Sequence, residues 1–434
     1  MGQLVEFNPA QSSAESDTFF LRNPAAWLRE KKLSRGFWVF FTAAFFFDFG
    51  FSVYFFLFNL YLLDIHFNER AIGLVGGAMT LGSAVATLPA GLLARRIGVR
   101  TPLIVCFIAA PVLGVLRALA MSEPLQIGLG FAAGLAMCLW GVCYLPALAR
   151  LTTEDNRAFA FSLIFSASIG TSTLGGVVCG YLPQWLNNAG FAMQPVEVKR
   201  LILLVSSAIA AIGLFAVLRT RLPQPRSEPQ PQRRLGIRRW RLDPFLLRFL
   251  VSMALWTAVL ASFTPFANVY LSRELHVPLS RIGLIFSAAQ ILQFCVVLLT
   301  PMVFRALGLI NGIVATQIMT ALAIGCLAET HNMRLAVPLY MAFSAMQWMS
   351  SPGLYNLLMS GVRDEDRSIA SSMTMFCNAV LQSGATALAG ILFVRFGYPH
   401  VMVGIAVLAA LAAGVFRTIV GPVARPIAGQ AEAA

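Results

Sequence analysis

The chain alternates between long apolar runs and short polar stretches that are rich in arginine. A helix needs about 20 mostly apolar residues to cross a bilayer, because each backbone N–H and C=O must be bonded within its own segment there. The clearest run, residues 37–63, carries one charged residue, Asp48. The pattern predicts an all-α polytopic membrane protein with twelve transmembrane helices, at residues 37–63, 71–94, 101–121, 125–149, 158–182, 200–218, 245–271, 281–304, 308–328, 335–360, 368–393 and 400–420.

A change of composition divides these helices into two groups of six. Between the sixth and seventh runs, residues 219–243 contain eight arginines and four prolines, which support neither a packed nor a membrane-spanning element. We expect a solvated cytoplasmic linker there. The predicted organisation is an N-terminal segment at 1–36, a six-helix bundle at 37–218, the linker at 219–244, a second six-helix bundle at 245–420 and a tail at 421–434.

The share of charged residues excludes an ordinary soluble globule. Charged residues make up 12% of the chain and apolar residues 58%, whereas about 25% of a typical soluble domain is charged. With the N-terminus placed in the cytoplasm, 23 basic residues fall on the cytoplasmic side and seven on the other, leaving out Arg117 and Arg248 near helix ends. By the positive-inside rule we expect both termini in the cytoplasm.

The same distribution of charge bears on partners and location. The net charge of +13 arises between the apolar runs, where orientation signals lie, so we expect no nucleic-acid partner. Arginine outnumbers lysine 29 to 3, which favours the inner membrane of a GC-rich bacterium. We expect the lipid bilayer as the surroundings and a monomer as the oligomeric state.

The two halves repeat each other at a nearly fixed offset. The stretch from His66 matches the stretch from His276, 210 residues later, and the same offset pairs Arg95 with Arg305. Matches in polar loops at one offset indicate a parallel repeat of two six-helix units. Such repeats occur in transporters whose halves move around a site near the middle of the membrane.

The loop between the second and third predicted helices resembles that of the major facilitator superfamily, which reads G-x-x-x-D-R-x-G-x-R/K. The resemblance implies a secondary transporter with two pseudo-symmetric six-helix bundles. It also implies that this loop gates the cytoplasmic side. Here Arg95 stands where the family has an aspartate, which puts the family's cytoplasmic latch in doubt. The gating residues expected from the resemblance are Gly91, Arg95, Arg96, Gly98 and Arg100, with Arg305 and Gly308 in the second half.

Asp48 is the strongest candidate functional residue. An ionisable side chain near the bilayer centre is costly, so it usually faces the interior of the bundle and serves a function. Desolvation favours the protonated carboxyl, which predicts a proton-coupling role for Asp48. A structural role as a hydrogen-bonded carboxyl between helices is the alternative. Asp48, Ser52, Phe55 and Asn59 share one helix face, and the repeat gives Thr257, Ala261, Thr264 and Asn268.

Further candidates for a substrate cavity are polar and aromatic residues within the predicted helices. The repeat pairs short hydroxyls of the first half with longer amides of the second, and amides donate and accept hydrogen bonds at once. Aromatic side chains are suited to the walls of such a cavity, although packing is an alternative role for them. These candidates are Thr80, Gln290, Gln293, Asn378, Gln382, Gln347, Trp348, Tyr355, Trp140 and Tyr144.

Other chemistry is not expected from this sequence. Arg117 lies toward the outer end of the third predicted helix, and we expect it to extend to the membrane interface rather than to bind an anion. We expect no enzyme activity, no cofactor and no bound metal, because no Walker-type loop and no metal-ligand spacing is present.

The leading function is secondary active transport of a small molecule by alternating access, coupled to protons through Asp48. Two alternatives remain open. The chain is a non-transporting membrane sensor or scaffold on the same fold, which Arg95 would favour, or it translocates a lipid or lysolipid. Fold alone does not choose among substrates.

Overall fold

The computed structural model consists of helices joined by short turns and loops in the residues that it describes, which are 33–190, 193–220, 244–330, 332–362 and 367–422. Polar side chains begin the first helices, because the first N–H groups of a helix lack partners within it. Ser34 and Asn68 accept hydrogen bonds from the backbone N–H groups of Phe37 and Ala71, at 3.1 and 3.0 Å. The first half contains α3 (Arg35–Asp64), α4 (Glu69–Ile97), α5 (Arg100–Leu119), α6 (Glu123–Leu151), α7 (Glu154–Asn188) and α8 (Pro195–Arg219).

Prolines interrupt two of the spans in the second half. Pro265 lacks an N–H and cannot continue the regular bonding of an α-helix. The chain therefore passes through a short 3-10 turn there, and Pro352 lies at the start of a new helix after Ser350. The second half contains α9 (Pro244–Phe263), η2 (Thr264–Phe266), α10 (Ala267–Arg273), α11 (Leu279–Leu307), α12 (Leu309–Ala328), α13 (Met333–Met349), α14 (Ser351–Gly361), α15 (Arg367–Val415) and η3 (Phe416–Val420).

Ten helices of the described chain are long and apolar enough to cross a membrane. Two predicted regions differ from simple single spans. The run 335–360 is divided between α13 and α14, and the runs 368–393 and 400–420 both belong to α15. Within α15, Gly397 leaves helical geometry with φ 74° and ψ 167°, so the element is kinked there. The twelve-helix count stays a prediction, as do the predicted domain boundaries, whose N-terminal segment, linker and tail lie largely outside the described residues.

The internal repeat is confirmed by the backbone. The helices α4 and α11 both have 29 residues and begin 210 positions apart, and α5 and α12 both have 20. His66 and His276 both have positive φ, and so do Gly98 and Gly308. Each pair is separated by the same 210 residues, so the chain adopts the same turns at both ends of the repeated helix.

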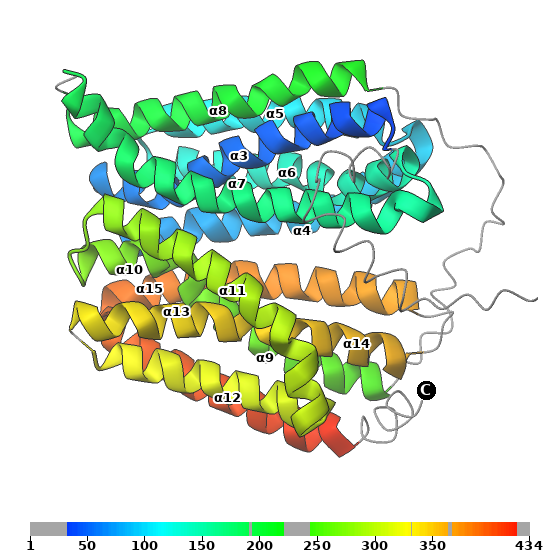
Figure 1. The fold of residues 1–434 in the computed structure, drawn as a ribbon. Helices are drawn as coiled ribbons and strands as arrows, with labels where there is room; N and C mark the ends of the chain where they lie inside the picture. The colour runs from blue at the N-terminus through cyan, green and yellow to red at the C-terminus, as the bar shows by residue number, and fades with distance from the viewer. Residues whose placement is uncertain (1–32, 191–192, 221–243, 331, 363–366, 423–434) are drawn as a thin grey trace, which may run out of the picture.

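The two halves lie against each other along two helix pairs, with α4 beside α15 and α7 beside α11 (Figure 1). Glycines allow this close approach. A methyl group on Gly73 of α4 would lie 3.1 Å from the Cα of Gly390, and one on Gly283 of α11 would lie 3.1 Å from the Cα of Gly180. The offset of 210 relates these two contacts to each other, so both interfaces use the same small-residue packing.

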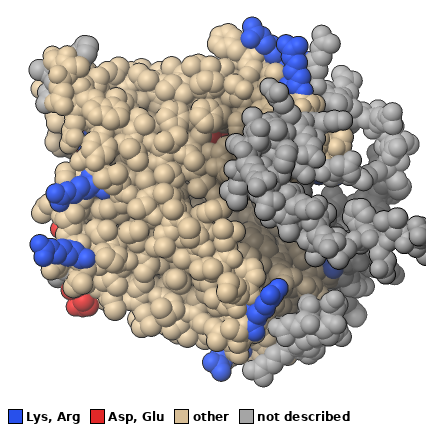
Figure 2. All heavy atoms as spheres, in the orientation of Figure 1, with Lys and Arg blue, Asp and Glu red and all other residues tan. Residues whose placement is uncertain are grey.

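The two ends of the bundle are named here after the predicted orientation. The inner end holds Arg35, Gly98 and Gly308, and the outer end holds Asp64 and Arg273. Figure 2 shows a broad surface band with few charged side chains, flanked by lysines and arginines toward both ends. This distribution fits a protein embedded in a bilayer, with charges near the two water-facing surfaces.

Candidate functional site: a central cavity between the halves

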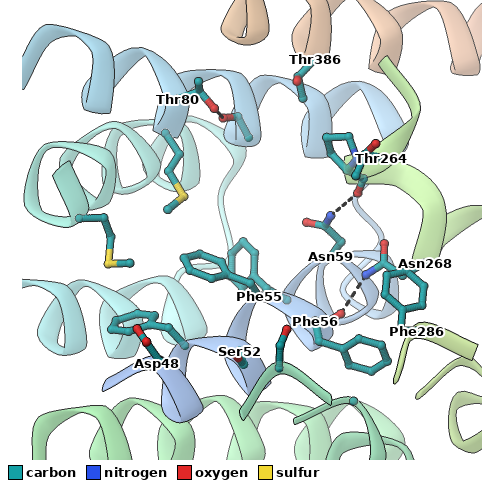
Figure 3. Close-up of a pocket in the computed structure, with 18 of the residues that line it drawn as sticks. Asp48, Ser52, Phe55, Phe56, Asn59, Thr80, Thr264, Asn268, Phe286 and Thr386 are labelled. Carbon is teal, nitrogen blue, oxygen red and sulfur yellow. Dashed lines mark hydrogen bonds between the residues drawn. The ribbon is translucent and has the colours of Figure 1, made fainter. Parts of the chain in front are cut away.

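A cavity of about 710 Å³ lies between the two halves. The first half contributes residues of α3, α4, α5, α6 and α7 to its lining, and the second half contributes residues of η2, α10, α11 and α15. Figure 3 shows polar side chains of α3 and aromatic rings of both halves around one open space. A site lined by two halves that repeat each other is the arrangement expected for a transporter of this architecture.

Two asparagines bound the cavity toward the outer end. Asn59 of α3 donates to the carbonyl of Pro265 at 2.8 Å, and Asn268 of α10 donates to the carbonyl of Phe56 at 2.9 Å (Figure 3). The two residues occupy matching positions of the repeat. Each half therefore binds the backbone of the other through the same residue type, which holds the outer end together.

The missing N–H of Pro265 explains a third contact at this level. Without that donor, the carbonyl of Ala261 loses its regular partner within the helix. The hydroxyl of Thr386 donates to this carbonyl at 3.1 Å, and a methyl group on Gly73 would lie 2.8 Å from the carbonyl oxygen of Thr386. The break in the seventh span and the closely packed α4–α15 interface thus meet at the same place.

An ion pair lies farther out on the α4–α15 side. One nitrogen of Arg273 contacts both carboxylate oxygens of Glu69, at 2.7 and 2.8 Å, and the hydroxyl of Tyr398 donates to the same carboxylate at 3.4 Å. Glu69 is 5% exposed, whereas the Arg273 side chain is 54% exposed. This group joins the two halves at the outer end.

The α7–α11 side is joined by neutral groups. The hydroxyl of Ser287 donates to the carbonyl of Thr173 at 2.7 Å, and the amide of Gln290 donates to the hydroxyl of Ser172 at 3.1 Å. Ser172 and Gln290 line the cavity, as Asn59, Asn268 and Thr386 do. Toward the inner end, Figure 2 shows the surface hollowed between the two halves.

Asp48 lies on the cavity wall, where hydroxyl and indole groups face it. The hydroxyl of Ser168 donates to its carboxylate at 2.7 Å, and the indole of Trp140 hydrogen-bonds the same group. Ser52, Phe55 and Asn59 line the same cavity, as the helical spacing predicts. Since Asp48 borders the open space, its carboxyl is reachable by a proton carried in water.

A second pocket of about 330 Å³ adjoins the first and belongs to the C-terminal half. Thr264, Pro265 and Gln382 line both, so the two pockets are continuous in their lining. Trp348 and Tyr355 line the second pocket and are 42% and 49% exposed. The hydroxyl of Thr257 donates to the amide oxygen of Asn378 at 3.0 Å within it.

Most of the residues predicted from the sequence border one of these pockets, although their role in binding stays a prediction. The first pocket includes Asp48, Ser52, Asn59, Thr80, Thr264, Asn268, Gln290 and Gln382, and the second adds Thr257, Trp348, Tyr355 and Asn378.

Four predicted residues are not among those that line these two pockets. Gln347 is 2% exposed and accepts a hydrogen bond from Thr264 at 3.0 Å, so it holds a lining residue. Trp140 and Tyr144 pack against each other, with ring centroids 4.7 Å apart. Gln293 borders neither pocket.

The predicted gating residues lie at the inner end, at the ends of α4 and α11. Gly98 and Gly308 end these helices with φ 82° and 76°, a backbone conformation that favours glycine. Arg100 donates to the carbonyl of Leu218 at 2.9 Å, which ties the loop to the end of α8. Gly91 lies within the last turns of α4, and Arg95, Arg96 and Arg305 are exposed.

The prediction for Arg117 is wrong. The side chain does not extend to the interface but is 3% exposed and lines the central cavity. Its guanidinium lies 4.1 Å from the ring centroid of Phe58. The ring gives the cation a favourable contact inside the bundle. Because this partner belongs to another helix, the sequence of α5 alone could not predict the contact. Phe286 and Thr386 also line the cavity and were not predicted.

The sequence was compared with models of known protein families. Residues 40–386 match the family model described as Major Facilitator Superfamily. The chain belongs to this superfamily. No curated protein matches the sequence.

Several solved transporter structures share the fold of this chain at low sequence identity. The nucleoside transporter NupG aligns with a TM-score of 0.73 and 15% identity over 89% of this chain and 99% of its own. An inward-facing, unoccupied bacterial homologue of the human lysosomal transporter Spinster aligns with a TM-score of 0.75 and 13% identity over 89% and 98%. A D-xylose–proton symporter aligns with a TM-score of 0.69 and 14% identity over 90% and 98%. At such identities the likeness establishes the fold alone.

Proposed function

We propose that this member of the Major Facilitator Superfamily is a secondary transporter of a small molecule that works by alternating access. The observation that carries the proposal is the cavity between two pseudo-symmetric halves, which reciprocal asparagine bonds join at its lining. In this proposal the structure is the state that opens to the inner end, and rocking of the halves exposes the same cavity to the outer end.

Two further observations support transport. The cavity holds polar groups from both halves, as a binding site that is exposed alternately to the two sides of the membrane requires. The fold is that of proteins named as nucleoside and sugar transporters, and it is also that of a bacterial Spinster homologue whose structure is named as inward-facing. We infer the bacterial inner membrane, with cytoplasmic termini, as the location.

Asp48 is the proposed proton-coupling residue. It is the acidic residue among the described residues that line the cavity, and it accepts hydrogen bonds from Ser168 and Trp140. Protonation would remove its charge and change its bonding to these two helices, α7 and α6. The protonation state of Asp48 would thereby bias which end of the bundle is closed.

Counterflow in proteoliposomes tests transport. Purified protein is screened by thermal shift against sugars, nucleosides, amino acids, organic anions, cationic drugs and lysolipids. Vesicles are loaded with each stabilising compound, and uptake of its labelled form is followed without a proton gradient. We expect rapid exchange of at least one compound. Stabilisation without exchange would contradict transport. It would favour the sensor alternative, which the exposed Arg95 in place of the family's aspartate also favours.

A further inference from the structure

Arg117 of α5 is a buried cation with no described carboxylate partner. Its side chain is 3% exposed. One terminal nitrogen points to the sulfur of Met79 at 3.7 Å, and the guanidinium carbon lies 4.1 Å from the ring centroid of Phe58. Its Nε has no hydrogen-bond acceptor among the described residues. A thioether and a ring are weak partners for a guanidinium, which has five N–H donors.

The acidic residues nearest in the fold are engaged or distant. Glu69 pairs with Arg273, and Asp64 pairs with Lys199 at 2.6 Å. Asp48 precedes Phe58 by ten residues on α3, which is roughly 15 Å along the helix axis. The charge of Arg117 is therefore not balanced by a described ion pair, and a buried charge without one is costly.

The position of Arg117 gives this charge access to a ligand. It lines the central cavity, together with the two residues that contact its guanidinium. The two side chains that contact it, Met79 and Phe58, are apolar, and the cavity lining also includes the apolar side chains Phe47, Phe51, Phe55 and Met137. An uncompensated donor group at the surface of an apolar cavity is the arrangement that fixes the orientation of a small ligand.

We propose that Arg117 binds the oxyanion of the substrate, so that the transported molecule is an organic anion with an apolar or aromatic body. This rests on the proposed transport function. A planar guanidinium matches the two oxygens of a carboxylate or phosphate, and such bonds are strong where water is excluded. The apolar wall takes the body of the molecule, while Asn59, Gln290 and Gln382 supply neutral hydrogen-bonding groups elsewhere on the cavity surface.

Matched charged and neutral compounds test this proposal on the detergent-purified full chain. The pairs are benzoate with benzamide, phenyl phosphate with benzyl alcohol, and lysophosphatidate with monoacylglycerol. We expect at least one anion to raise the melting temperature by about 2 °C at ten times its dissociation constant, and its neutral partner to have no such effect. Which of the three anions binds shows whether the site takes a carboxylate, a free phosphate ester or a lipid headgroup.

Two variants of Arg117 and one control assign the effect to this residue. Arg117→Met keeps an unbranched side chain in the apolar wall and should abolish the anion-dependent shift. Arg117→Lys keeps the charge and should reduce affinity about tenfold or more, because the bidentate geometry is lost. The control is Arg200→Gln, since Arg200 also contacts a methionine sulfur, at 3.7 Å from Met121, but lies outside the cavity. Its anion response should equal that of the wild type.

Each result decides the proposal. Equal shifts from anions and their neutral partners, no shift from any anion, or an unchanged anion response in Arg117→Met would overturn it. If Arg117→Met does not fold, Arg117→Lys and the wild-type pairs still decide. Anion binding that depends on Arg117 without counterflow would leave this inference standing and contradict transport. Counterflow of a neutral compound that is unaffected by Arg117→Lys would support transport and contradict this inference.

Discussion

The two halves of the bundle differ most where they face the cavity. The first half places Asp48 and Arg117 on its surface, and the paired positions of the second half are neutral, Thr257 for Asp48 and, at the offset of 210, Leu327 for Arg117. The second half instead places longer amides opposite short hydroxyls. The pairs separated by 210 residues are Thr80 and Gln290, Ser172 and Gln382, and Ser168 and Asn378. Charge belongs to one half of the cavity, and neutral hydrogen bonding is extended in the other.

The outer end shows the opposite behaviour, because its paired positions stay alike. Asn59 and Asn268 both bind the backbone across the interface, and Gly73 and Gly283 both bring helices together. Contacts that must close symmetrically keep the same residue in both halves. Positions that would touch substrate or protons have diverged, which supports the proposal that coupling and anion recognition belong to the first half.

The largest effect is expected from removing the carboxylate of that half. Asp48→Asn should abolish accumulation of substrate against its gradient, because the residue no longer exchanges a proton. Counterflow should persist, since the amide still accepts a bond from Ser168. Proton-driven uptake and counterflow in the same vesicles measure both. Thr257→Val, at the paired neutral position, is the control and should keep accumulation. Unchanged accumulation in Asp48→Asn would refute proton coupling through this residue.

A bulkier residue in a glycine contact should have the next largest effect. The side chain of Gly73→Val would meet the carbonyl of Thr386, so closure of the outer end would cost about 1–3 kcal/mol more. We expect a shift toward an outward-open state. A cysteine introduced at Thr80 should then react faster with a membrane-impermeant maleimide from the outer side. Gly128→Val, where nothing lies within 4 Å of an added Cβ, should leave the rate unchanged.

The ion pair at the outer end should matter less than the glycine contact. Arg273→Gln removes the partner of Glu69, but the Arg273 side chain is 54% exposed and its charge is screened by solvent. We expect a loss of about 1 kcal/mol from the closed outer end. The matched substitution on the other interface is Gln184→Ala, whose bond to Ser280 is long at 3.4 Å. Equal changes of thermal stability in the two variants would contradict the distinction between these interfaces.

The smallest effect is expected from one amide of the second half. Gln290→Leu removes the bond to Ser172 and one polar group of the cavity. A single neutral hydrogen bond contributes about 1 kcal/mol, so affinity should fall about fivefold. A titration by thermal shift measures this against Gln293→Leu, which borders neither pocket and should bind as the wild type does. A larger loss of affinity in Gln293→Leu than in Gln290→Leu would contradict the conclusion that Gln290, and not Gln293, lines the cavity.

The sequence revealed the features that depend on one helix or on the repeat. Apolar runs located the spanning helices, and the offset of 210 anticipated the equal turns at His66 and His276. The spacing of Asp48, Ser52 and Asn59 placed them on one face, and the structure shows all three at the cavity. Such patterns are local, so they can be read without knowing how the helices pack.

Features that depend on packing between helices could not be read in the same way. Arg117 lies near a helix end, where arginines usually reach the interface, and its contact with Phe58 requires α5 to pack on α3. The second-layer position of Gln347 depends on Thr264 of another helix. The division of 335–360 between α13 and α14 at Ser350 was not predicted, whereas the predicted break between 368–393 and 400–420 coincides with the kink at Gly397 within α15.

Distances between the halves test alternating access most directly. Spin labels are placed in a cysteine-free background at Arg70 and Arg281 for the outer end, and at Ile97 and Leu307 for the inner end, all of which are exposed. Pulsed electron resonance in liposomes compares the wild type with Gly73→Val. The account predicts that the variant lengthens the outer distance and shortens the inner one together. An outer distance that lengthens while the inner distance stays fixed would contradict coupled movement of the halves around the cavity.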